Sequence, residues 1–201
     1  MGISTMLPEP IAVTIQVTRV FERLNIPYLI SGSLASTLHG MIRTTQDSDI
    51  IAEMRLEHVQ PFVESLQNEF FIDEEMIAES IQHNLSFNII HRDTMFKVDV
   101  FIPQPRSFHQ SQLARAQKQT FSVVDSEVSA NFSSAEDTIL SKLEWYRLGG
   151  EVSERQWRDT PVGVGVLKTR SGELDLDYLH KWAKELKVSD LLERALKQAG
   201  T

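Results

Sequence analysis

The sequence predicts an α/β (α+β) fold, in which a small mixed β-sheet flanked by helices is followed by a bundle of helices. Three observations lead to this expectation. Apolar residues recur at helical spacing in residues 11–24, short strand-like runs alternate with helical patterns over the next hundred residues, and the pattern is mainly helical from Ser134 onward. We therefore expect a domain of residues 1–132 that carries the sheet and a helical region of residues 133–201 packed on it.

Each expected element has a local signal. Val13, Val17 and Phe21 share one face of the first helix, and Pro27 follows its end. A short polar linker around Arg92 joins two alternating runs, which is typical of a hairpin. We expect four or five strands, within 28–30, 46–52, 85–91, 95–102 and a β-rich stretch at 119–130. The further expected helices are 33–39, 56–68, 73–81, 107–116, 135–148, 151–159, 175–186 and 189–198, with a loop or hairpin at 160–172.

Composition excludes several classes of protein. The 201 residues suffice for one good-sized domain with a helical extension, and the hydrophobic share of 41% is that of an ordinary folded protein. There is no cysteine, so disulfides and thiolate metal sites are excluded. No apolar run reaches the roughly 20 residues of a membrane helix, and the first ten residues lack the features of a signal peptide. We expect a cytoplasmic protein with no membrane partner.

The net charge of −8 disfavours general binding to a nucleic-acid backbone. A local basic stretch remains, because Arg106, Arg115 and Lys118 lie in a segment without acidic residues. This stretch would fit contact with an RNA acceptor, and it also fits a solvated face. All three tryptophans lie in the helical half, where we expect them in the core or in helix packing; they are Trp145, Trp157 and Trp182.

Three aspartates are the strongest chemical signal. Asp47 and Asp49 point to one face of an expected strand, with α-carbons about 7 Å apart, and Asp99 lies within the strand pattern at 95–102. If the two strands are neighbours, the three carboxylates converge and repel one another unless a cation neutralises them. Such oxygen ligands suit Mg²⁺, and we expect two ions. Asp99 alone also fits a structural ion pair with Lys97 or Arg43.

A glycine turn supplies the second half of the pattern. Gly32-Ser33 precedes the expected helix 33–39, and backbone N–H groups at such a turn bind phosphate oxygens. The Ser33 hydroxyl would add a donor, and Arg43 would neutralise phosphate or pair with the aspartates. A Gly-Ser pair before a helix is also common in proteins without a phosphate site.

These residues resemble the DNA polymerase β-type nucleotidyltransferase superfamily in its minimal form. The superfamily pattern is a Gly-Ser turn, then Asp-x-Asp, then a later aspartate on a strand. Here these positions are Gly32 and Ser33, then Asp47 and Asp49, and finally Asp99. The resemblance implies a nucleotidyltransferase fold, covers residues 10–102, and implies that the three aspartates bind metal and carry the catalysis.

The closer resemblance is to the AbiEii-like nucleotidyltransferases of type IV toxin–antitoxin systems. Gly40, Arg43 and Thr45 precede the aspartates with the spacing of that group. This resemblance implies that Gly32, Ser33, Arg43 and Thr45 bind the nucleotide and that a neutralising antitoxin protein is a partner.

The helical half carries a looser part of the same resemblance. Glu136-Asp137 followed by Lys142 resembles the family's helix, and Arg158-Asp159 resembles a later pair. By this resemblance Lys142 contacts nucleotide phosphates and Asp159 lies near the site. Lys142 also fits a solvated helix charge, paired with Asp137 or with Glu144.

The resemblance implies a Mg²⁺-dependent transfer of a nucleoside monophosphate from an NTP to an acceptor hydroxyl. The acceptor would be tRNA or another RNA, a protein or a small molecule. Asp99 would also help to deprotonate that hydroxyl. The alternative is a nucleotide-binding or partner-binding module of the same fold without turnover. Such a module usually loses one carboxylate, whereas this sequence keeps all three, which favours activity.

Overall fold

The structure is a computed structural model, and its described residues form two compact units. The described residues are 7–39, 47–123, 126–151, 157, 166–167 and 172–200. The sheet unit comprises Met1–Leu34 and Thr44–Ser133, and the helical unit comprises Ala35–Arg43 and Ser134–Thr201. Most of the expected helix 151–159 and of the expected loop 160–172 lies outside the described residues.

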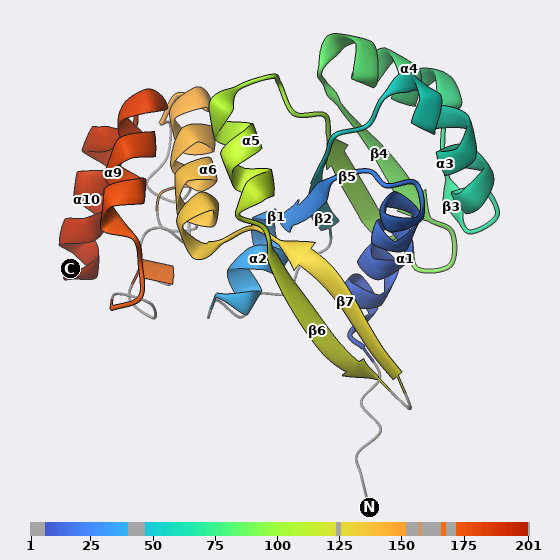
Figure 1. The fold of residues 1–201 in the computed structure, drawn as a ribbon, viewed down its shortest axis with the longest axis horizontal. Coiled ribbons are helices and arrows are strands. Elements are labelled where there is room, and N and C mark those ends of the chain that lie inside the picture. The colour runs from blue at the N-terminus through green and yellow to red at the C-terminus, as the bar shows by residue number, and fades with distance from the viewer. Residues whose placement is uncertain are drawn as a thin grey trace, which may run out of the picture. The chain divides into compact units, whose positions relative to one another are not determined.

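One mixed sheet organises the sheet unit, with the strand order β3-β4-β5-β2-β1-β7-β6 (Figure 1). Its strands are β1 (Tyr28–Ser31), β2 (Asp47–Ala52), β3 (Phe70–Phe71), β4 (Ser86–His91), β5 (Lys97–Phe101), β6 (Gln117–Val123) and β7 (Ser126–Phe132). The described residues thus form seven strands, so the expectation of four or five was wrong. The two-residue β3 is too short to show a period, and the β-rich stretch at 119–130 falls within two strands, β6 and β7.

The central strands run in both directions. β1 pairs antiparallel with β2, and β2 pairs parallel with β5. β4 and β5 form the expected antiparallel hairpin. β7 joins the sheet by a parallel pairing with β1, which the sequence did not predict because two such strands are far apart in the chain.

Two helices cover one face of the sheet. α1 (Glu9–Arg23) and α3 (Val59–Leu66) meet through the stacked rings of Phe21 and Phe62, whose centroids are 5.2 Å apart. Phe62 contacts the edge of Phe87 on β4. Phe87 is level with Val100, and Val100 is level with Ile50, and all three are buried. The core therefore lies on this face, and the alternate residues of β2, β4 and β5 point to the other.

The remaining helices of the sheet unit connect its strands. α2 (Gly32–Leu38) begins in this unit directly after β1. η1 (Leu56–His58) precedes α3, so the expected helix at 56–68 is divided into a short 3-10 turn and an α-helix. α4 is Glu74–His83, and α5 is Ser107–Ala114. None of the helices in the described ranges is both long and apolar enough to cross a bilayer.

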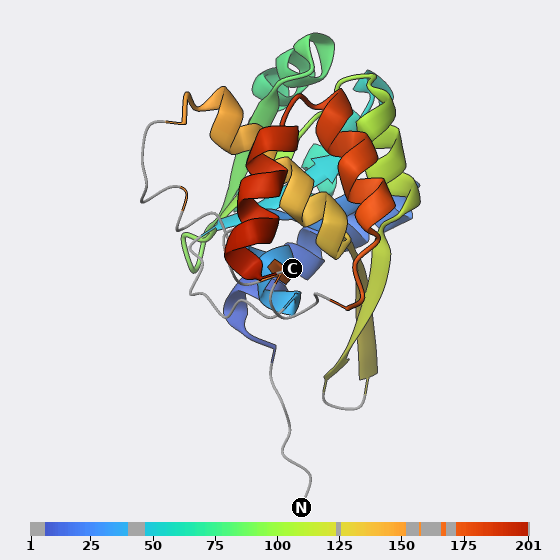
Figure 2. The ribbon, with the colours of Figure 1, turned by 90° about the vertical axis from the view of Figure 1, so that its left-hand side faces the viewer.

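The helical unit is built on three helices that pack on one another. They are α6 (Ala135–Leu148), α9 (Leu176–Glu185) and α10 (Ser189–Ala199), and Figure 2 shows α9 and α10 in red beside α6. Trp157 and Trp182 are buried, as expected. Trp145 is 61% exposed, so its assignment to the core was wrong. It lies two residues after the buried Leu143, about 200° around the helix.

Candidate active site

The two strands that carry the aspartates, β2 and β5, are neighbours, which is the condition under which the sequence predicted that the carboxylates converge. Asp49 is level with Asp99 across the parallel β2–β5 pair, and Asp47 is level with Lys97. Strands in a sheet are about 5 Å apart. Ser48 and Ile50 are buried, whereas Asp47 and Asp49 are half-buried. The carboxylates therefore lie on the face of the sheet opposite the core that α1 and α3 cover.

A row of polar residues crosses four adjacent strands on this face. Ser31 on β1 is level with Asp49, Asp49 with Asp99, and Asp99 with the exposed Asn88 on β4. Residues opposite one another in a sheet share a face. Neither Ser31 nor Asn88 was predicted from the sequence to be a site residue. The signal for Asn88 was its position between the buried residues Phe87 and Ile89, which places it with Asp99 once the hairpin register is known.

Gly32 lies directly against the Asp49 carboxylate. Its φ is +61°, and a Cβ built on it would lie 1.8 Å from Oδ2 of Asp49. A side chain at this position would both occupy the space of the carboxylate and strain the backbone. The glycine turn and the Asp-x-Asp strand are therefore parts of one site. Ser33 follows on α2 and is half-buried, and its binding of phosphate stays a prediction.

A lysine ammonium is bound to the third aspartate. Nζ of Lys97 lies 2.7 Å from Oδ2 of Asp99, with side chains that are 42% and 19% exposed. The hydrogen bond to Asp99 raises the pKa of Lys97, and the charges of Asp99, Asp47 and Asp49 raise it further against the opposing effect of burial. The ammonium therefore lies in the field of all three carboxylates. The ion pair between Lys97 and Asp99, left open from the sequence, is present.

The donor set fits a hard divalent cation. Three carboxylates from two neighbouring strands supply the oxygen ligands that Mg²⁺ prefers. Within the described ranges, however, no three acidic or histidine side chains are already gathered in a metal-holding arrangement. The Asp99 carboxylate is bonded to Lys97 instead. A metal ion at this site must therefore compete with that ammonium.

The other predicted nucleotide ligands are distributed as follows. Arg43 and Thr45 lie outside the described residues, as do Gly40 and Asp159. Lys142 lies on α6 of the helical unit and is half-buried. Its contact with nucleotide phosphates stays a prediction.

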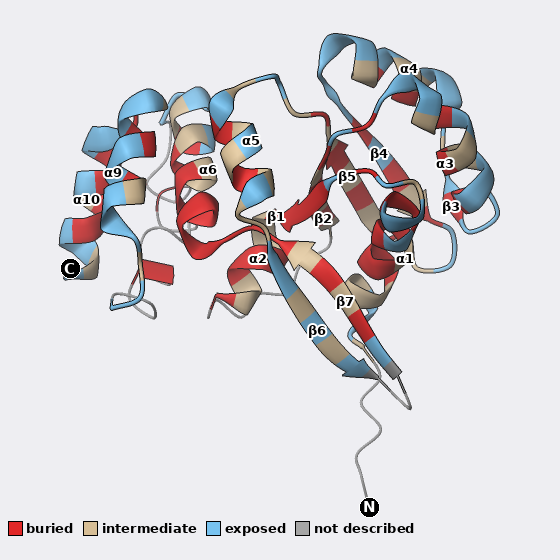
Figure 3. Ribbon diagram, in the orientation of Figure 1, coloured by how far each residue is buried: buried red, intermediate tan, exposed pale blue. Residues whose placement is uncertain are grey.

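The Glu136-Asp137 pair on α6 has a structural role. Asp137 is fully buried, and its two carboxylate oxygens accept hydrogen bonds from the Ser134 hydroxyl at 2.8 Å and the Tyr178 hydroxyl at 2.7 Å. The Ser134 hydroxyl in turn accepts from the backbone N–H of Asp137, which caps the helix. Glu136 accepts from the backbone N–H of Asp175 at 3.0 Å. Figure 3 shows this first turn of α6 as buried.

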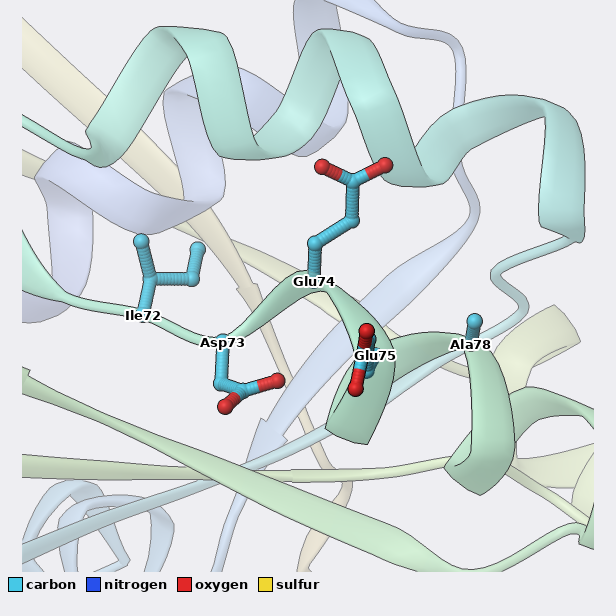
Figure 4. A pocket seen from close by; sticks show the side chains of 5 residues that line it. All are labelled: Ile72, Asp73, Glu74, Glu75 and Ala78. Atoms are coloured by element: carbon cyan, nitrogen blue, oxygen red, sulfur yellow. The ribbon is translucent and has the colours of Figure 1, made fainter.

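A hollow at the start of α4 is unrelated to this chemistry. It is lined by Ile72, Asp73, Glu74, Glu75 and Ala78, and Figure 4 shows that its acidic side chains point in different directions. Asp73 caps α4 by accepting a hydrogen bond from the backbone N–H of Met76 at 2.8 Å. Acidic residues in the first turn of a helix interact favourably with the helix dipole, so helix formation accounts for these residues.

Several solved structures resemble the chain, including the following three. An antigenic nucleotidyltransferase-like protein from Paracoccidioides brasiliensis matches with 18% identity and a TM-score of 0.48, over 94% of this chain and 93% of that one. The lincosamide antibiotic adenylyltransferase LnuA, bound to lincomycin, matches with 14% identity and a TM-score of 0.43, over 78% and 96%. The antibiotic-resistance factor ANT(2'')-Ia matches with 15% identity and a TM-score of 0.48, over 96% and 94%.

Two of these three proteins are nucleotidyltransferases or nucleotidyltransferase-like by name. None is named AbiEii-like, so that closer resemblance stays a prediction. No family model and no curated protein sequence matches the chain. Identities below 20% and TM-scores below 0.5 do not assign an activity to this chain, so its function is inferred from the residues of the site.

Proposed function

We propose that this protein is a Mg²⁺-dependent nucleotidyltransferase that moves a nucleoside monophosphate from an NTP to an acceptor hydroxyl. The observation that carries the proposal is the level pairing of Asp49 with Asp99, with Asp47 two residues away on the same face. Three carboxylates on the side of the sheet away from its core are costly unless they bind cations. Gly32, pressed against Asp49, brings the glycine turn to the same place.

Asp47, Asp49 and Asp99 would hold the metal. Two Mg²⁺ ions, when bound, stabilise the attacking and leaving oxygens of an in-line displacement. Asp99 accepts the proton of the acceptor hydroxyl, which raises the nucleophilicity of its oxygen. A bond then forms between that oxygen and the α-phosphorus, while the bond between the α-phosphorus and the β-bridging oxygen breaks and pyrophosphate leaves.

The acceptor belongs to one of three classes, namely RNA such as tRNA, a protein side chain, or a small molecule. The sequence resemblance adds a toxin–antitoxin or phage-defence context to the proposal, with an antitoxin protein as partner. A small antitoxin-like reading frame beside the gene would support that context.

Label transfer tests the activity. The full-length protein is incubated with each α-³²P-labelled NTP, Mg²⁺ and cell extract, and labelled acceptors are separated by size. We expect transfer by the wild type and a loss of roughly 100- to 1,000-fold in Asp99→Asn, the range for removal of one transition-state group. Asp93→Asn removes the same charge from the exposed β4–β5 turn and should transfer normally. Absence of transfer by the wild type, or equal transfer by Asp99→Asn, would contradict the proposal.

The bond between Lys97 and Asp99 favours a second candidate, a nucleotide-binding module without turnover. In that case the ammonium permanently replaces a metal ion at the third carboxylate. Calorimetric titration with NTP and Mg²⁺, together with a pyrophosphate assay, separates the two candidates. Binding without pyrophosphate release in the presence of extract would favour the module.

A further inference from the structure

A positive charge is built into the carboxylate cluster by the chain itself. Lys97 and Asp99 are two residues apart on β5 and share a face, and β2 places Asp47 level with the first and Asp49 level with the second. The four side chains thus form two facing pairs on adjacent strands. One ammonium stands among three carboxylates, so it partly neutralises the repulsion that a metal ion would otherwise have to relieve.

The bond of this ammonium is short but not enclosed. Nζ of Lys97 is 2.7 Å from Oδ2 of Asp99, while the lysine side chain is 42% exposed. Lysine carries a compact, strongly hydrated charge on a flexible four-carbon stem. Such a side chain can leave the carboxylate for solvent without any rearrangement of the strands.

We propose that Lys97 is a resident cation, held on Asp99 in the metal-free protein and displaced from it when a divalent cation binds. The inference rests on the proposed metal site. Because the ammonium is tethered two residues from Asp99, it competes with a metal ion at a high effective concentration. The free protein therefore binds a divalent cation more weakly than its three carboxylates alone would. The displaced ammonium becomes available to a phosphate anion that arrives with the metal.

Mn²⁺ binding to the full-length protein, without nucleotide, tests the competition directly. Free Mn²⁺ is measured by electron paramagnetic resonance during titration. Lys97→Met removes the ammonium and keeps an apolar stem of similar length, so we expect its Mn²⁺ affinity to rise roughly tenfold. Lys97→Arg keeps the charge and should bind Mn²⁺ as weakly as the wild type. Lys118→Met removes the same charge from an exposed position on β6 and should leave the affinity unchanged.

Thermal unfolding gives a second readout. Mn²⁺ should raise the melting temperature of Lys97→Met more than that of the wild type, because ligand stabilisation increases with affinity. A merely structural lysine would lower the melting temperature of the metal-free variant without changing its response to Mn²⁺.

Failure of the inference and failure of the metal site give different results. If the wild type binds Mn²⁺, Asp49→Asn abolishes this binding and Lys97→Met binds no more tightly than the wild type, the resident-cation inference is overturned while the metal site stands. If neither the wild type nor Lys97→Met binds Mn²⁺ in the millimolar range, the metal site and the inference are both overturned.

Discussion

The two units of the molecule use carboxylates in opposite ways. In the helical unit, Asp137 is fully buried and both of its oxygens are bound by the neutral hydroxyls of Ser134 and Tyr178. In the sheet unit, Asp49 and Asp99 lie level on adjacent strands, only partly buried, and Asp99 is bound by a flexible ammonium. Both sets of acids stood out in the sequence as parts of one family resemblance, and only their surroundings distinguish them.

The difference shows how to separate structural from chemical acids. A carboxylate that accepts hydrogen bonds from fixed, uncharged donors is already stabilised and holds its neighbours in place. Carboxylates that face one another repel, and a bound cation relieves this repulsion, so such a pair favours cation binding. The first kind should be needed mainly for stability and the second mainly for activity.

The largest effect that would sharpen this comparison is a loss of activity without a loss of stability. Asp49→Asn keeps the shape of the side chain beside Gly32 and removes one charge from the cluster. We expect label transfer to fall roughly 100- to 1,000-fold, while the free energy of unfolding in urea stays at or slightly above that of the wild type. A variant that transfers label normally, or that unfolds much more easily, would break the comparison.

In the helical unit, removal of the buried carboxylate is expected to reduce stability. Asp137→Ala leaves the hydroxyls of Ser134 and Tyr178 without their buried acceptor and removes two hydrogen bonds to a charged group. We expect the free energy of unfolding to fall by about 3 kcal/mol, measured by urea denaturation. Asp177→Ala provides the control, because that exposed aspartate lies nearby at the start of α9. Equal stability of Asp137→Ala and wild type would refute the structural role.

A smaller effect on stability is expected at Gly32, the glycine of the turn that lies against the Asp49 carboxylate. Gly32→Ala brings a methyl group onto the Asp49 carboxylate and places alanine at a φ of +61°. The backbone strain costs about 1–2 kcal/mol, seen as a lower free energy of unfolding, and the displacement of Asp49 should also reduce label transfer. Gly172→Ala is the matched control, because a Cβ there would meet no atom within 4 Å. If Gly32→Ala were as stable and active as Gly172→Ala, the close contact of Gly32 with the Asp49 carboxylate would matter for neither stability nor activity.

The smallest effect is expected for Asp190, an exposed carboxylate that is neither buried like Asp137 nor part of the aspartate cluster. Nη2 of Arg147 donates to both oxygens of Asp190, and this bond lowers the pKa of Asp190 below its ordinary value of 3.8. A lowered pKa stabilises the folded state above about pH 4, and this contribution is lost as the pH falls through the folded-state pKa. For an exposed pair it is below about 1 kcal/mol. Between pH 5 and pH 3, the free energy of unfolding of Asp190→Asn should therefore fall slightly less than that of the wild type. A difference between the two proteins of more than about 1 kcal/mol would contradict this expectation.

Much of the central sheet could be predicted because its signals are local. The alternation around Asp99 and the polar linker at Arg92 predict the β4–β5 hairpin, and the structure confirms it. The level pairing of Asp49 with Asp99 could be stated only as a condition, because the register of parallel strands depends on the connection between them. The place of Asn88 beside Asp99 follows from the register of the β4–β5 hairpin.

Other features depend on tertiary contacts that leave no period in the sequence. The structural role of Asp137 includes a hydrogen bond from Tyr178, which is 41 residues away in the chain. The Lys97–Asp99 bond was one of two candidates, since Arg43 would have served the same charge. The two-residue β3 has too few residues to alternate.

The parallel pairing of β2 with β5 also has a consequence for folding kinetics. Asp49 and Asp99 pair across β2 and β5, and the chain between these strands contains α3, α4 and β4. Contacts between residues that are distant in sequence form slowly, because the entropy of closing the loop must be lost first. A nascent chain that ends before β5 contains two of the three aspartates and cannot assemble the cluster. Nucleotide and metal binding should therefore be acquired late in refolding, in the same step as the closure of the central sheet.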